Sequence, residues 1–227
     1  MKLFSKFALL ATLLLAGTTV SAQRQYEPHF WAGGRGGVTM SKQNLYPSVP
    51  QSMITGITAG AILRYIEEKH FGLQVELNLE QRGWKEKFEN EPFEFSRRFT
   101  YIQLPILTHI TFGSNTKVFF NAGPELGLMI GEKTTSNFDL NNTSSTDNYP
   151  QNRATAQYTL AVKNKFDYGI SGGCGVELPL GNNNYIFAEG RFYYGLQDVF
   201  GNKKTDDFSG SNGMSIMLTA GYMFRLK

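Results

Sequence analysis

A strict alternation of apolar and polar residues runs through residues 71–82, FGLQVELNLEQR. Every second residue from Phe71 to Leu79 is apolar, whereas the intervening residues and Glu80 are Gly, Gln, Glu or Asn. A period of two predicts a β-strand with two different faces. Such a strand belongs either to a soluble sandwich, with core on one side and water on the other, or to a membrane barrel, with lipid outside and a polar lumen inside.

Similar segments recur along the chain and predict eight strands. They lie at about residues 30–41, 53–66, 71–84, 95–111, 117–131, 165–180, 185–199 and 213–226. The connections alternate between long polar loops (42–52, 85–94, 132–164 and 200–212) and short turns (67–70, 113–116 and 181–184). Tight turns at one end and longer loops at the other are typical of outer-membrane barrels. The predicted fold is therefore all-β: an eight-stranded antiparallel transmembrane up-and-down β-barrel, with long loops at the cell surface and with short turns and both termini in the periplasm.

The first 22 residues have the three parts of a cleavable signal peptide. Lys2 and Lys6 supply positive charge, residues 7–16 are apolar, and Val20-Ser21-Ala22 provides small residues before a cleavage site. We therefore expect a signal peptide at residues 1–22 and one barrel domain at residues 23–227. After the signal, no apolar run is long enough for a membrane helix, so a membrane location requires a closed barrel.

The polar face of the predicted strands carries both acids and bases. These residues are Arg35, Arg64, Glu76, Glu80, Arg82, Glu125, Glu177, Glu189 and Arg191. Facing lipid at the membrane midplane would cost about 2–4 kcal/mol for each Arg. The interior of an eight-stranded barrel is just wide enough to be filled by side chains. The pattern thus predicts a charge network in the lumen; the alternative is that these residues coat the outside of a soluble barrel such as a lipocalin.

Aromatic residues gather near the predicted strand ends. The members are Tyr65, Phe71, Tyr185 and Phe224 on the turn side and Tyr168, Tyr193 and Tyr194 on the loop side. Two aromatic belts at headgroup level are expected of a barrel in a bilayer. Ordinary β-propensity also enriches aromatics in strands, so the belts alone do not decide between membrane and water.

Charge and residue usage exclude several kinds of protein. Loss of Lys2 and Lys6 reduces the 22 basic residues by two, against 19 acidic ones, which leaves a net charge of about +1. That balance argues against a nucleic-acid partner. The single Cys174 forms no intramolecular disulfide and is interpreted as a small hydrophobe on the apolar face. We expect no metal site and no cofactor.

Enzyme chemistry is the least favoured function. A hydrolase acting on surface lipid needs a nucleophile, a base and an orienting group within hydrogen-bond reach. The histidines are His29, His70 and His109, and all three lie toward the predicted periplasmic end. None is at the outer end, so we predict no catalytic residues.

Several stretches in order make the chain resemble the PorT-like outer-membrane β-barrel proteins of Bacteroidetes. The stretches are residues 35–41 (RGGVTMS), 76–83 (ELNLEQRG), 101–105 (YIQLP), 123–127 (GPELG), 167–177 (DYGISGGCGVE), 191–196 (RFYYGL) and 221–224 (GYMF). The resemblance covers essentially the whole predicted mature chain. It implies an eight-stranded outer-membrane barrel without catalytic residues, and the founding member of the family takes part in protein secretion.

Three functions are therefore weighed. The first is a barrel with a charge-filled lumen that serves a structural or interaction role through its loops, in contact with outer-membrane lipid and with envelope or secretion proteins as partners. The second is a narrow channel or small-solute transporter, and the third is a lipid hydrolase. Conductance separates the first two, and lipase activity tests the third.

Overall fold

The computed structural model describes residues 27–89, 92–140, 149–150, 155–181, 183–201 and 206–226. The predicted signal peptide and its boundary with the barrel domain lie outside these ranges and stay predictions. Within the described residues, the strands are β1 (His29–Tyr46), β2 (Gln51–Ser52), β3 (Ile54–Ile66), β4 (Phe71–Glu86), β5 (Phe95–Phe112), β6 (Lys117–Ser136), β7 (Phe166–Pro179), β8 (Asn184–Asp198) and β9 (Gly210–Arg225). One 3₁₀ helix, η2 (Ala156–Tyr158), lies between β6 and β7. No helix in this part of the chain has the length and apolar character needed to cross a membrane.

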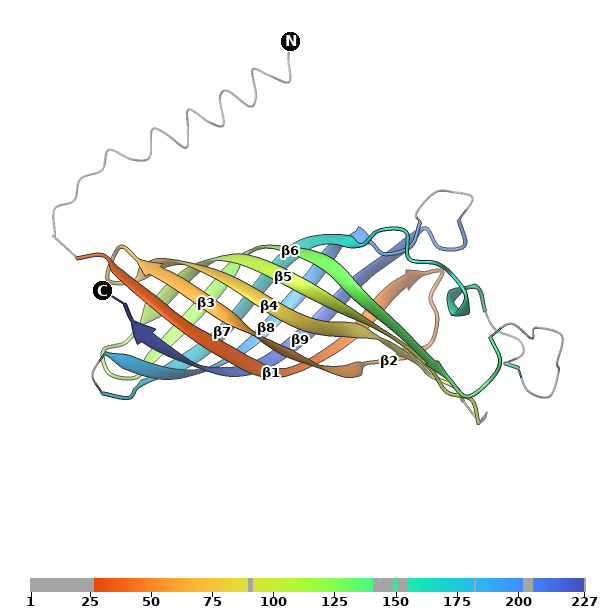
Figure 1. Ribbon diagram of the computed structural model, residues 1–227, viewed down its shortest axis with the longest axis horizontal. Coiled ribbons are helices and arrows are strands. Elements are labelled where there is room, and N and C mark those ends of the chain that lie inside the picture. The colour runs from red at the N-terminus through yellow and green to blue at the C-terminus, as the bar shows by residue number, and fades with distance from the viewer. Residues whose placement is uncertain are drawn as a thin grey trace, which may run out of the picture.

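The eight long strands close into an antiparallel barrel. Neighbours in sequence pair with one another from β3 to β9, β1 pairs with both β3 and β9, and the pairing of β4 with β5 completes the ring. The hairpins β3–β4, β5–β6 and β7–β8 lie at one end of the barrel, with the start of β1 and the end of β9, whereas β2 and η2 lie at the other (Figure 1). We call these the turn end and the loop end. The predicted fold class is confirmed.

The strands extend farther toward the loop end than their apolar alternation indicates. β1 continues to Tyr46, because residues 42–46 pair with residues 210–214 of β9, and β6 continues to Ser136. The short β2 pairs with Lys85 and Glu86 of β4 inside the segment predicted as a loop. The predicted loop boundaries at residues 42 and 132 were therefore wrong. Backbone ladders need only paired N–H and C=O groups, and polar residues supply these as well as apolar ones.

The outer surface of the barrel is apolar. In the stretch that first indicated a strand, Leu77 is 57% exposed while its neighbour Glu76 is 1% exposed. The same alternation continues around the wall, where Leu63, Ile102, Ile130, Ile170, Phe192 and Leu218 face outward. An apolar exterior around a polar interior inverts the arrangement of a soluble barrel and suits a lipid environment.

The glycine cluster at the start of the chain serves close strand packing. A Cβ atom at Gly37 would lie 2.1 Å from the backbone oxygen of Leu218, and one at Gly33 would lie 2.1 Å from that of Tyr222. Both positions are on the inward parity of β1, and the atoms that a Cβ would meet belong to the paired strand β9. Glycine at such positions is common where a strand curves tightly and another backbone approaches closely.

Candidate functional site: the barrel interior

All nine predicted charged residues point into the interior, and each is at most 5% exposed. They come from six strands, β1, β3, β4, β6, β7 and β8, and the inward parity of each strand brings them to a common axis. The structure adds Asp167, which is 6% exposed on β7. Asp167 shares its parity with Glu177, and that parity could have identified it in the sequence. We refer to these ten residues as the central network.

Glu76 is the most heavily bonded member of the central network. Its carboxylate accepts hydrogen bonds from Arg35 at 2.9 Å and from both terminal nitrogens of Arg191 at 2.6 and 2.8 Å. The side-chain amides of Gln74 and Asn78 donate to it as well. Because several donors satisfy its lone pairs, this buried charge is compensated in both charge and hydrogen bonding.

Glu189 links the two arginines that bind Glu76. One of its carboxylate oxygens lies 3.1 Å from Nη1 of Arg35 and 2.9 Å from Nη2 of Arg191. The amide of Asn121 donates to the other oxygen at 2.9 Å. The four charged groups therefore form a closed set that joins β1, β4 and β8 across the lumen.

Arg82 gathers a second set of acids. Its nitrogens lie 3.0 Å from Glu80, 3.3 Å from Glu125 and 3.2 Å from Asp167. The guanidinium also lies 3.9 Å from the ring centre of Tyr193, whose hydroxyl donates to Asp167 at 2.8 Å. Stacking on an aromatic face and contact with several carboxylates suit the flat guanidinium group.

Arg64 forms the third set, nearest the turn end. Its Nη1 donates to Glu177 at 2.5 Å and to the hydroxyl of Tyr185 at 2.6 Å, and its Nε donates to Gln74 at 2.7 Å. Gln74 bonds Glu76 too, so this set is continuous with the first. His109 lies beside it, with Nε2 3.8 Å from Glu177.

Five of the seven residues predicted to form aromatic belts lie on the outer surface, and two do not. Phe71, Tyr168, Tyr194 and Phe224 are 36–51% exposed on the outer surface, and Tyr65 is half-buried there. Tyr185 and Tyr193 point inward instead, at 8% and 0% exposure. Their placement in the belts was wrong, because adjacent strand residues face opposite sides and Tyr193 cannot share the outer face of Tyr194.

Aromatic side chains, with a few aliphatic ones, fill the loop end of the interior, and the alternation of residues along the strands does not predict this cluster. The buried members are Leu45, Val49, Trp84, Phe95, Phe99, Tyr101, Met129, Phe138, Tyr149, Tyr158, Val199, Phe200 and Phe208. We call this cluster the aromatic cap. Phe138, Tyr149 and Tyr158 lie between β6 and β7, in a segment predicted only as a long polar loop. The aromatics within that polar composition were the available signal.

Arg97 connects the aromatic cap to the barrel wall. It pairs with Glu132 across β5 and β6, and its Nη1 donates to the backbone oxygen of Leu160 at 2.6 Å. Its guanidinium also lies 5.1 Å from the ring centre of Phe200. One strand residue thus holds two segments of the loop end over the lumen.

The three histidines each contact another polar group. His109 Nδ1 bonds Asn121 at 2.8 Å, His70 Nδ1 bonds the backbone oxygen of Thr111 at 2.8 Å, and His29 contacts Arg225. Across the described ranges, no group of three or more His, Cys, Asp or Glu side chains is placed to hold a metal ion. The carboxylates are engaged mainly with arginines.

Comparisons with known proteins agree with this architecture. Residues 21–201 match the family model described as outer membrane protein beta-barrel domain. Among solved structures, the outer membrane protein OprG from Pseudomonas aeruginosa is similar with a TM-score of 0.50 and 12% identity, over 89% of this chain and 99% of that one. Neisserial surface protein A is similar with a TM-score of 0.45 and 12% identity, over 88% of this chain and 99% of that one. No curated protein sequence matches the chain.

Proposed function

Because the chain belongs to the outer membrane protein beta-barrel domain family, we propose that it is a non-conducting outer-membrane anchor that acts through its surface loops. The family and the apolar outer wall place the protein in the outer membrane, in contact with lipid. The proposal concerns the role of the barrel in that membrane. The side chains in its interior stabilise the fold and block the lumen, and the loops at the loop end bind partners.

The single observation that carries the proposal is the double closure of the lumen. The central network crosses the middle of the barrel, and the aromatic cap fills its loop end. A channel needs a continuous polar path wide enough for a solute, with sites from which the solute can leave. Bidentate arginine–carboxylate contacts are among the stronger polar interactions in proteins and favour a fixed interior.

Conductance in planar bilayers tests the filled interior. The purified chain, refolded and inserted at single-molecule density, should give no stable conductance step. The quadruple variant Arg35→Ala, Glu76→Ala, Glu189→Ala and Arg191→Ala removes two positive and two negative charges from the lumen. When Phe138→Ala is added to open the aromatic cap, this variant should conduct a small current of cations or anions. A large stable pore in the unmodified protein would contradict the proposal and favour the channel function.

The orientation and the partners are further parts of the proposal. We place the long loops at the cell surface, the short turns and both termini in the periplasm, and envelope or secretion proteins among the partners. The resemblance to PorT-like proteins of Bacteroidetes supports the link to secretion. Protease added to intact cells should cleave between β6 and β7 but not at the turn 67–70. Gentle extraction and native sizing should then find the protein in a larger complex; migration as a single barrel would remove the secretion link.

The proposal also excludes hydrolase activity. Its support is the set of histidine contacts: Nδ1 of His109 bonds the amide oxygen of Asn121 and Nδ1 of His70 bonds the backbone oxygen of Thr111, so neither nitrogen contacts a carboxylate or a serine among the described residues. Purified protein in mixed micelles should release no fatty acid from phospholipid or lipid A. Release that disappears in His109→Ala but persists in His70→Ala would show the opposite.

A further inference from the structure

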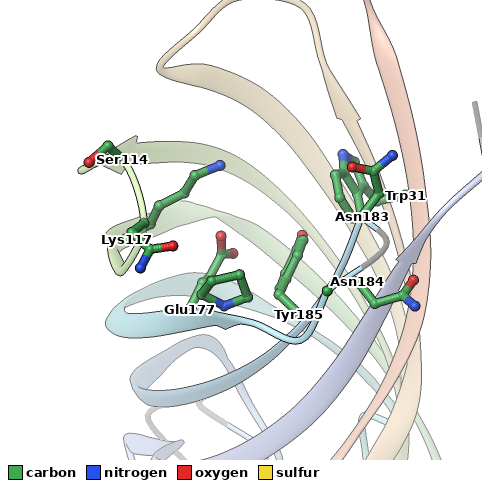
Figure 2. A pocket seen from close by; sticks show the side chains of 10 residues that line it. Trp31, Ser114, Lys117, Glu177, Asn183, Asn184 and Tyr185 are labelled. Carbon is green, nitrogen blue, oxygen red and sulfur yellow. The ribbon is translucent and has the colours of Figure 1, made fainter.

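A second polar site lies at the turn end, away from the loops to which the proposed function assigns interaction. It is a cavity of about 230 Å³ lined by residues of β1, β6, β7 and β8 and by the turns β5–β6 and β7–β8. Figure 2 places Lys117 on one side, Trp31 and Asn183 on the other, and Glu177 and Tyr185 between them. We call this cavity the turn-end pocket.

The turn-end pocket brings together two opposite charges that do not neutralise each other. Lys117 and Glu177 are direct partners in the pairing of β6 with β7. No ion pair between them is found among the described residues, and Glu177 pairs with Arg64 through Oε1 at 2.5 Å instead. Within the described ranges, Lys117 pairs with no carboxylate and Oε2 of Glu177 accepts no hydrogen bond. The pocket therefore presents an ammonium group and a carboxylate oxygen that are both available to a ligand.

Aromatic and amide groups complete the lining. The rings of Trp31 and Tyr185 pack with their centres 4.7 Å apart and form an apolar wall. The indole Nε1 of Trp31 is buried and has no hydrogen-bond partner among the described residues. Asn115, Asn183 and Asn184 also line the pocket. An aromatic wall beside a carboxylate is a favourable environment for an organic ammonium.

We propose that the turn-end pocket binds a free α-amino acid or a free dipeptide, both of which carry an ammonium group and a carboxylate. The ligand carboxylate contacts Lys117, its ammonium group contacts Oε2 of Glu177, and its side chain lies against Trp31 and Tyr185. The volume fits this class, since pockets for drug-sized ligands measure about 300–1,000 Å³ and this one is smaller. The site shares Glu177 with the central network, but it lies at the turn end, away from the loops to which the proposed function assigns interaction.

Calorimetric titration of the full chain folded in detergent micelles tests the pocket. The probes are phenylalanine and alanylphenylalanine, with acetylphenylalanine and phenylalaninamide as forms that lack one charged end. Saturable binding of phenylalanine identifies a free amino acid as the ligand, and saturable binding of alanylphenylalanine alone identifies a free dipeptide. Blocking either end should weaken binding about tenfold or more, because each block removes a charge-assisted hydrogen bond.

Matched variants assign the two charged contacts. Lys117→Gln should weaken binding of phenylalanine about tenfold but leave phenylalaninamide unchanged, and Glu177→Gln should weaken phenylalaninamide. Lys69→Gln is the control, because Lys69 is an exposed lysine of a turn at the same end and does not line the pocket. Heat-modifiable migration on gels confirms that each variant is folded. The proposal is overturned if neither probe binds saturably, if acetylphenylalanine or inorganic phosphate binds as tightly as phenylalanine, or if Lys69→Gln weakens binding as much as Lys117→Gln.

Discussion

The middle and the loop end of the barrel use the same inward positions with opposite chemistry. Arg82 and Trp84 are two residues apart on β4 and both point inward, yet the first contacts three carboxylates and the second packs against Phe95, Phe99 and Phe200. The parity of a strand thus decides that a side chain faces the interior. It does not decide whether that interior is ionic or aromatic.

The difference between the two regions follows from what can reach each of them. In the middle, the partners of the charged groups described above come from the barrel wall, either from the same strand or from another one. At the loop end, segments between the strands fold inward as well, and Phe138, Tyr158 and Phe208 come from these segments. The central network therefore belongs to the closed sheet, whereas the aromatic cap couples the sheet to its loops.

The largest expected effect is on the central network. Arg191→Met leaves Glu76 and Glu189 with one arginine in place of two, and breaking a buried ion pair from one side costs about 3–5 kcal/mol. Urea unfolding of the micelle-bound barrel measures the loss. Arg98→Met is the control, because Arg98 is only partly buried and donates to the backbone of Thr55; its cost should stay within about 0.5 kcal/mol. Equal losses would mean that the central network is not a distinct stabilising unit.

The next effect separates the aromatic cap from the barrel. Phe138 packs against Phe88, Phe93, Phe95, Tyr149 and Tyr158. Phe138→Ala should cost about 3 kcal/mol of local stability. The expected result is faster proteolysis between β6 and β7 with an unchanged unfolding midpoint for the barrel. Tyr46→Ala is the control, because Tyr46 is an aromatic residue of the loop end that is 71% exposed. If Phe138→Ala instead lowered the unfolding midpoint of the barrel, the aromatic cap and the barrel would be one cooperative unit.

A smaller effect tests a single bond in the central network. Tyr193→Phe removes the hydroxyl that donates to Asp167 but keeps the ring beneath Arg82. Leaving this buried carboxylate with one donor fewer should cost about 1–2 kcal/mol in the unfolding free energy. Tyr194→Phe changes the adjacent residue, which faces outward, and should leave stability unchanged. If Tyr194→Phe lowered the unfolding free energy more than Tyr193→Phe does, Tyr193 would face lipid instead of the interior.

The smallest effect is expected at the surface of the loop end. Lys163 pairs with Asp206 at 2.8 Å, and the lysine side chain is 51% exposed. Lys163→Gln should cost about 0.2–1 kcal/mol at low salt and less at high salt, because exposed pairs are weak and screened. Loop proteolysis at two salt concentrations measures it, with Lys165→Gln as the control. If Lys163→Gln reduced the stability of the loops more than Phe138→Ala does, and equally at both salt concentrations, then this ion pair rather than the aromatic cap would be the main interaction that holds the loops together.

The sequence by itself determined which side chains face inward and how the strands are ordered. The alternation at residues 71–82 put Glu76 and Glu80 in the interior and Leu77 and Leu79 on the outer wall, as observed. This succeeded because the period of two is a local property of an extended chain. It failed where a local rule was applied loosely, as when Tyr193 and Tyr194 were assigned to one face.

Only the tertiary structure decided which inward groups meet. Arg191 and Glu76 are 115 residues apart, and Arg64 and Glu177 are 113 apart. Their contact depends on the tilt and stagger with which the strands close the barrel, and no local pattern encodes these. The same holds for the aromatic cap, because loops pack without periodicity, and for the turn-end pocket, where barrel closure engages Glu177 with Arg64 and leaves Lys117 unpaired within the described ranges. The alternation along each strand determined whether a side chain points inward or outward, and the closure of the barrel determined which other side chain it contacts.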